Sequence, residues 1–208
     1  WNPQHAKECG RITAYEIRAS SIPWNYAPVL DISKQPLWGR IFETFGEDTY
    51  LASEMGKAFV AGSQGTHISD TTSAAVCLKH FIGYGTPMNG KDRSPAIIPE
   101  HYLRQYYLPP FKTAIEHGTL TIMLNSGILN GIPGHADGYL ITEVLKKELG
   151  FQGFTISDWD DISNSHKVHR VAKDKKEAAK LAVLAGMDMC MVPYDASFAV
   201  NVAVSVMT

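Results

Sequence analysis

A short apolar segment that ends in a carboxylate and an indole is the clearest chemical feature of the chain. Residues 153–159 read GFTISDW, and their aromatic and β-branched types are typical of a buried strand. Asp158 would stand at the end of this strand, with Trp159 beside it. A carboxylate can attack the anomeric carbon of a sugar, and an indole offers an apolar face to a pyranose ring. The alternative is a surface aspartate that caps the next helix.

Chemically capable side chains also stand at the ends of other predicted strands. Asp31 follows one apolar run, Lys79-His80 ends a second, and Met123 lies near the end of a third. The carboxyl ends of parallel strands meet at one edge of a sheet, so these side chains would gather near Asp158. Lysine and histidine can hydrogen-bond hydroxyl groups, and a nearby cation keeps a carboxylate ionised at neutral pH.

Helix and strand patterns alternate along the whole chain. This alternation predicts an α/β fold, in which parallel strands are joined by right-handed helical crossovers. Pro109 and Pro110 are expected to interrupt the third helix. The predicted helices cover residues 3–19, 49–64, 103–115, 138–149, 174–186 and the start of another at 198–208, and the predicted strands cover 24–30, 74–81, 120–124, 153–158 and 187–192.

Composition excludes several classes of function. The 208 residues are 45% hydrophobic, enough for a large core, and their net charge of −2 argues against a nucleic-acid partner. No apolar run reaches the ~18 residues of a membrane span. Three separated cysteines, Cys9, Cys77 and Cys190, do not match a zinc module, and we expect buried thiols with neither metal nor cofactor. The chain begins with Trp1 and no leader, so we expect it to begin within a longer protein.

Five motifs occur in order between residues 25 and 162. They are NYAPVLD, PLWGRIFETFGED, LKHFIGYG, TIMLNSGILNGIPGHA and GFTISDWDDI. With the flanking helices and the AGMDMCMV segment, they resemble the N-terminal barrel domain of glycoside hydrolase family three, the β-glucosidase-like group. The resemblance covers nearly the whole chain and implies a (β/α)8 barrel. Five predicted strands are fewer than eight, so we expect residues 1–208 to be an incomplete barrel.

The resemblance also implies roles for individual residues. Asp158 would be the catalytic nucleophile, and Trp159 would line the sugar subsite. Arg40 of the WGR motif would join Lys79 and His80 in hydrogen-bonding the terminal sugar, and Met123 would form an apolar wall. Many members carry Tyr three positions after this methionine, where the chain has Ser126. Asp31 is open between a contact with the sugar and a salt bridge that braces a loop.

Structural interpretations compete with several of these roles. Arg40 could pair with Glu43 or Asp48, and Lys79-His80 could be a structural pair. The acidic residues that follow Trp159 are expected to be solvated or helix-capping, and Asp188 is expected to brace the barrel. The three histidines expected at the surface are His135, His166 and His169.

A retaining glycosidase needs two carboxyl groups roughly 5–5.5 Å apart, one as nucleophile and one as acid/base. The resemblance places the acid/base Glu in a C-terminal α/β domain that this chain does not contain. We therefore expect that domain as a partner in the full-length protein. We also expect the isolated 208 residues to be inactive and poorly soluble, because an open barrel exposes strand edges.

The predicted function is that of a retaining, exo-acting β-glucosidase acting on terminal β-D-glucosyl residues of oligosaccharides. The loop GYGTPMNGKDRSPA lacks the histidine of the N-acetylhexosaminidase branch, and Trp159 replaces the cysteine frequent in xylosidases. The alternatives are a β-xylosidase or another family-three specificity, a catalytically silent sugar-binding barrel, and a metal enzyme that uses His80 and Asp158. The resemblance leads us to expect an extracellular, periplasmic or lysosomal location.

Overall fold

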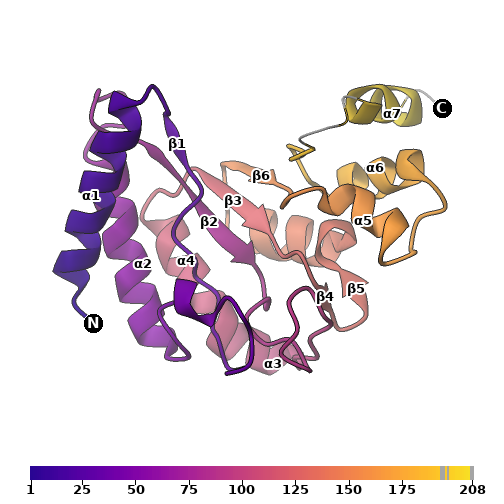
Figure 1. Ribbon diagram of the computed structural model, residues 1–208, viewed down its shortest axis with the longest axis horizontal. Helices are drawn as coiled ribbons and strands as arrows, with labels where there is room; N and C mark the ends of the chain where they lie inside the picture. The colour runs from indigo at the N-terminus through magenta and orange to yellow at the C-terminus, as the bar shows by residue number, and fades with distance from the viewer. Residues whose placement is uncertain (193–194, 196, 207–208) are drawn as a thin grey trace.

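The computed structural model describes residues 1–192, 195 and 197–206, and is organised around a four-stranded parallel sheet (Figure 1). The strands are β1 (Trp24–Asn25), β2 (Ala75–Phe81), β3 (Thr121–Leu124) and β6 (Phe154–Ile156). They pair in chain order, with Asn25 opposite Val76 and Ile122 opposite Thr155. The predicted α/β fold is confirmed, and all four strands end at the same edge of the sheet.

Helices connect successive strands (Figure 1). Pro109 and Pro110 do not break the third helical segment, because they occupy the first turn of α4, where a missing N–H group is tolerated. The helices are α1 (Pro3–Ala19), α2 (Thr49–Gln64), α3 (Glu100–Tyr102), the π-helix η2 (Leu103–Tyr107), α4 (Leu108–Glu116), the π-helix η4 (Tyr139–Glu148), α5 (Asp161–Lys167), α6 (Lys175–Leu184) and α7 (Ser197–Val206). Two short 3₁₀ helices are η1 (Ile41–Glu43) and η3 (Gly134–Ala136).

The helices α1 and α2 begin where the sequence signals predict. The side chains of Asn2 and Asp48 accept hydrogen bonds from backbone N–H groups of the first turns, which satisfies donors that have no partner within the helix. The two helices then pack in close contact. A Cβ atom at Gly62 would lie 1.9 Å from the backbone oxygen of Lys7, so only glycine permits this approach.

The sheet is buried on both faces. Leu78 and Ile122 belong to the large core beneath the helices. Their neighbours Cys77 and Met123 point to the opposite face and pack with Ile156 in a second, smaller cluster. Successive strand residues alternate between faces, so one face carries the helices and the other faces inward, as in the interior layers of a barrel.

The structure departs from the sequence prediction at both edges of the sheet. The strand predicted over 24–30 is paired regularly only at its start, since Pro28 has no N–H group to donate. Farther along, the edge continues as single contacts, such as the bond from Lys79 N–H to the Pro28 oxygen (3.1 Å). The strand predicted over 187–192 is reduced to one bridge, between Met189 and Ile156.

Three smaller predictions also need correction or limits. A hairpin of β4 (Ile128–Leu129) and β5 (Ile132–Pro133) and the helix α5 were not predicted. Cys9 is exposed, although buried thiols were expected, whereas Cys77 is buried. Residues 207 and 208 of the predicted last helix lie outside the described residues. Among the helices of the described part of the chain, none has the length and apolarity needed to cross a membrane.

Candidate active site

Asp158 lies directly after β6 at the carboxyl edge of the sheet and is only 8% exposed. Its Oδ1 accepts a hydrogen bond from the backbone N–H of Trp159 (2.5 Å), and its Oδ2 accepts one from the hydroxyl of Ser126 (2.7 Å). The backbone N–H of Asp158 donates to Nε2 of His135 (3.1 Å). Ser126 and His135 both belong to the segment after β3, which therefore fixes the orientation of the carboxylate.

His80, at the end of β2, stands between two carboxylates. Its Nδ1 lies 2.8 Å from Oδ2 of Asp31, which also accepts the backbone N–H of His80 (3.1 Å). Its Nε2 lies 3.5 Å from Oδ2 of Asp158. The loop after β2 can come this close because Gly85 has no side chain. A Cβ atom at this position would lie only 2.9 Å from the backbone oxygen of Ile32. The strand ends of β1, β2 and β6 are therefore joined through His80.

Asp31 is fully buried, and its described contacts are with His80. Of the two alternatives for Asp31, the pairing that braces a loop is therefore the one that matches its contacts in the structure. A direct contact between Asp31 and a sugar stays a prediction.

Electrostatics favour the ionised form of Asp158. Burial by itself raises the pKa of this carboxyl group. The charge on His80, the hydrogen bonds from Ser126 and the Trp159 N–H, and the charge of Arg93 outweigh burial and lower the pKa below its usual value. A carboxylate that stays ionised at neutral pH is suited to nucleophilic attack.

Arg40 pairs with Glu43, as the structural interpretation of the WGR motif expected. Its Nε lies 2.7 Å from Oε1 and its Nη2 2.8 Å from Oε2, a bidentate geometry. The guanidinium also lies over the ring of Tyr84, 5.6 Å from its centroid, and that ring packs edge-on against His80. The pair is partly exposed, so Arg40 reaches the same edge of the sheet as Asp158 with hydrogen-bonding surface still open.

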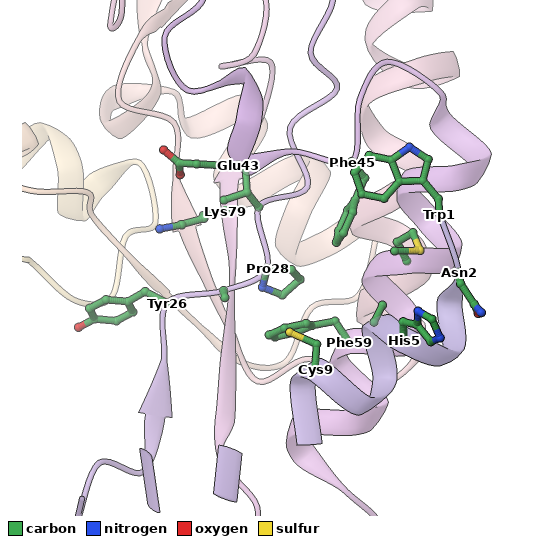
Figure 2. A pocket seen from close by; sticks show the side chains of 14 residues that line it. Trp1, Asn2, His5, Cys9, Tyr26, Pro28, Glu43, Phe45, Phe59 and Lys79 are labelled. Atoms are coloured by element: carbon green, nitrogen blue, oxygen red, sulfur yellow. The ribbon is translucent and has the colours of Figure 1, made fainter. Parts of the chain in front are cut away.

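Lys79 borders a pocket of about 830 Å³ on the β1 side of the sheet. Figure 2 shows Glu43 and Lys79 at one side of this pocket and Trp1, Phe45 and Phe59 at the other. Of the residues that the structure describes, none makes a hydrogen bond or ion pair with the Lys79 ammonium group. The side chain is therefore available for an external oxygen.

Trp159 and Met123 differ in accessibility. Trp159 is 49% exposed, so its ring presents apolar surface next to Asp158. Met123 is buried in the inward-facing cluster with Cys77 and Ile156. The indole thus lies at the surface of the site, whereas the methionine lies below it.

Comparison with known proteins identifies the family of the chain. The family model described as the glycosyl hydrolase family 3 N terminal domain matches residues 1–207. The chain belongs to glycosyl hydrolase family 3. Its parallel sheet and helices form part of the barrel-type fold found in solved family 3 structures.

Curated family 3 relatives include β-glucosidases and β-xylosidases. A lysosomal beta glucosidase of Dictyostelium discoideum is 47% identical over 98% of this chain and 26% of its own length. A periplasmic beta-glucosidase of Salmonella typhimurium is 37% identical over 92% of this chain and 25% of its own. A beta-xylosidase of Formosa agariphila is 38% identical over 92% of this chain and 27% of its own. The chain therefore spans about a quarter of the length of these relatives.

Solved family 3 structures share the fold closely. A mutant beta-glucosidase of Listeria innocua in complex with laminaribiose superposes with a TM-score of 0.88 at 32% identity, over 92% of this chain and 27% of that one.

Four residues of this candidate site escaped the sequence prediction: Ser126, Asp161, Arg93 and His135. The Ser126 hydroxyl that bonds Asp158 also bonds Oδ2 of Asp161, and Nη1 of Arg93 lies 3.0 Å from Oδ1 of Asp161. Asp161 was expected to be solvated or helix-capping, but it is 1% exposed. Burial raises its pKa to about 6, against the opposing effects of Ser126 and Arg93. A signal was present, because Asp161 follows Asp158 by three residues and Ser126 stands where the family resemblance predicts a tyrosine.

His135 also contradicts the prediction of a surface histidine. It is 2% exposed and accepts the backbone N–H of Asp158 through Nε2, so its proton is on Nδ1. Burial lowers its pKa to about 4. His166 and His169 are half-buried.

Asp188 braces β6, as predicted, because Oδ2 accepts the backbone N–H of Thr155 (2.8 Å) and Oδ1 accepts from Lys146 (2.7 Å). Within the described residues, no group of three or more His, Cys, Asp or Glu side chains is arranged to hold a metal ion.

Proposed function

We propose that the protein containing this chain is a retaining, exo-acting β-glucosidase, which hydrolyses terminal β-D-glucosyl residues of oligosaccharides with Asp158 as nucleophile. The observation that carries the proposal is a buried carboxylate at the carboxyl edge of the sheet, lying beside an exposed indole. The carboxylate accepts hydrogen bonds from Ser126 and from the Trp159 N–H, and the backbone N–H of Asp158 donates a third bond to His135. The lowered pKa of Asp158 supports the role, and so does the membership of family 3.

In the proposed mechanism, a carboxylate oxygen of Asp158 attacks the anomeric carbon while the bond to the leaving-group oxygen breaks. The leaving oxygen takes a proton from an acid/base glutamate, which we place in a C-terminal α/β domain outside this chain. The resulting covalent glycosyl–enzyme is then hydrolysed by water, which the same glutamate deprotonates. Two inversions at the anomeric carbon retain its configuration.

Other side chains at this edge are suited to holding the sugar. Lys79 and Arg40 have open donors for sugar hydroxyls, and His80 lies 3.5 Å from Asp158, within reach of the same ring. The exposed ring of Trp159 offers a stacking surface. We propose that Asp31 acts on the sugar through His80, since its carboxylate already bonds that ring. Met123 would support the site from the inward-facing cluster.

The second candidate is a β-xylosidase, which the identity to the Formosa agariphila enzyme favours. The sequence supports glucose, because Trp159 stands where xylosidases often have cysteine. The location that we propose, lysosomal, periplasmic or extracellular, rests on relatives whose names give the first two compartments.

The test is covalent trapping in the full-length protein. Incubation with an aryl 2-deoxy-2-fluoro-β-glucoside should give a stoichiometric adduct by intact mass, which peptide mapping assigns to Asp158. Asp158→Asn should abolish the adduct. Asp160→Asn is the matched control, because Asp160 lies in the same peptide and has φ 54°, which Asn tolerates. Among the described residues, its side chain bonds Lys167 at the surface and no other group. Labelling only by the fluoro-xyloside would favour the xylosidase, and labelling by neither would favour a silent sugar-binding barrel.

A further inference from the structure

The Ser126 hydroxyl lies between two buried carboxyl groups. Its oxygen is within hydrogen-bond distance of Oδ2 of Asp158 (2.7 Å) and also of Oδ2 of Asp161. All three residues are buried, and they come from different segments: Ser126 follows β3, Asp158 follows β6, and Asp161 begins α5. Water therefore has little access to the contact.

The number of hydrogens available between Ser126 and the two carboxyl groups determines which of the groups donates and which accepts. A hydroxyl carries one hydrogen, so Ser126 can donate to only one carboxylate. If both aspartates were ionised, the second would face the lone pairs of Ser126 at hydrogen-bond distance without a proton between them. One additional proton on the pair removes this conflict.

The hydrogen bonds around Asp161 indicate which carboxyl oxygen can carry that proton. Oδ1 of Asp161 accepts from Nη1 of Arg93 (3.0 Å) and from the side-chain amide of Asn164 (2.7 Å). Within the part of the chain that the structure describes, the hydrogen-bond partner of Oδ2 is Ser126. A proton on Oδ2 can be donated to the Ser126 oxygen, and Ser126 can then donate its own hydrogen to Asp158. In this arrangement the hydrogens of the Asp161 carboxyl group and of the Ser126 hydroxyl each have an acceptor.

We propose that Asp161 is a positioning residue for the nucleophile: while it holds the shared proton, the Ser126 hydroxyl donates to Asp158, and Arg93 fixes Asp161 in place. The inference rests on the proposed role of Asp158 and adds a regulation of that site by pH. The raised pKa of Asp161 agrees with the geometry.

The groups that face Asp161 come from every neighbouring segment. The loop after β2 contributes Arg93, β6 leads to Asp158, and α5 contributes Asn164. His135 and His169 also interact with Arg93: burial is the main cause that lowers the pKa of each, and the charge of Arg93 lowers it further. Loss of the Asp161 proton would add a second negative charge and leave Ser126 shared between two carboxylates. The orientation of Asp158 should then weaken as pH rises.

The experiment measures the rate of covalent labelling of the full-length protein by 2,4-dinitrophenyl 2-deoxy-2-fluoro-β-D-glucoside between about pH 4.5 and pH 8. Dinitrophenolate is a weakly basic leaving group that needs no proton, so the rate reports the nucleophile. We expect the wild-type rate to fall severalfold as pH rises through about 6, the pKa of Asp161. Asp161→Asn should label at a rate that does not change in this range, because its amide donates permanently to Ser126. Asp161→Ala and Ser126→Ala should be slower at every pH, by ~10-fold for one lost hydrogen bond to a charged group.

Two further variants separate positioning from a merely structural role. Arg93→Met removes a cation from Asp161, so the inflection should move to higher pH, and Arg93→Lys should restore it in part. Asp160→Asn should keep the wild-type profile. An inflection that persists in Asp161→Asn, or equal rates for Asp161→Asn and Asp161→Ala, would overturn the proposal.

A measurement independent of activity distinguishes this proposal from the proposed function. Infrared difference spectra should show a protonated carboxyl band that disappears as pH rises through about 6 in the wild type and is missing in Asp161→Asn. If the wild type is not labelled but the band titrates in this way, the proposed function fails and the assignment of the shared proton to Asp161 stands. If the band is missing from the wild type, the assignment of the proton to Asp161 fails.

Discussion

Replacing Asp161 by Asn should stabilise the full-length protein at neutral pH and leave its stability unchanged in acid. The folded protein raises the pKa of Asp161 from 3.8 to about 6, chiefly through burial. A group whose pKa is raised by folding contributes its full stability below the unfolded pKa and loses it as pH rises through the folded pKa. Asn cannot ionise, so the variant avoids that loss.

The magnitude follows from the two pKa values. At ~1.4 kcal/mol for each tenfold difference in proton affinity, values of 3.8 and about 6 correspond to about 3 kcal/mol at pH 7.5. The difference should shrink to less than about 1 kcal/mol by pH 4 and vanish below the unfolded pKa of 3.8, where both proteins carry a neutral group at this position. The intervening range, roughly pH 4 to 6, should show a progressive change.

Thermal unfolding of the wild type, Asp161→Asn and Asp160→Asn at about pH 4, 6 and 7.5 measures this effect. We expect Asp161→Asn to unfold several degrees above the wild type at pH 7.5 and at nearly the same temperature at pH 4. Asp160 is partly exposed and pairs with Lys167, so its variant should change little at any pH. An Asp161→Asn protein that melts below the wild type at pH 7.5, or gains equally at pH 4, would refute the reasoning.

Four other predictions concern the site. Asp31→Asn removes a charged partner from buried His80 and should lower kcat/KM by ~10–100-fold in steady-state assays, while KM for the substrate changes less. Trp159→Ala should raise KM by ~2–10-fold, since stacking contributes ~0.5–1.5 kcal/mol. His135→Ala leaves the backbone N–H of Asp158 without its acceptor and should cost ~1–3 kcal/mol of unfolding free energy in denaturant titrations, together with part of kcat. Incubation with a chelator should leave turnover unchanged. A loss of turnover would instead favour the alternative of a metal enzyme with His80 and Asp158 as ligands.

Local signals explain which parts of the fold could be predicted. The bounds of α1 and α2 follow from a capping residue at the start of each helix and from helical periodicity within it, both of which lie close in sequence. The positions of Asp158 and His80 could also be predicted, because each ends an apolar run that forms a strand. The regular pairing of β1 with β2 is short because Pro28 cannot donate a backbone hydrogen bond. Whether a proline interrupts a strand in this way depends on which side of the strand has a neighbour.

The rest of the site could not be predicted because its contacts are made between distant loops. Ser126, Asp161 and Arg93 are ordinary polar residues in their own segments, and only the parallel register of β3 and β6 brings the first two together. The burial of His135 depends in the same way on the turn after the β4–β5 hairpin. Composition and spacing do not encode such encounters, whereas the motif resemblance pointed to candidate site residues without these partners.

The dispersed origin of the contacts around Asp158 has a consequence for folding kinetics. The contacts of Asp158 with His80, Ser126 and His135, and the contact of His80 with Asp31, each join residues that lie tens of positions apart in the sequence. They form only when every strand has its native register. A slip of one residue in β3 would turn Ser126 away, because successive strand residues face opposite sides. Contacts of such long sequence separation form late and slowly. During refolding, reactivity at Asp158 should therefore appear after helical content has recovered, which makes the carboxylate a reporter of correctly registered sheet assembly.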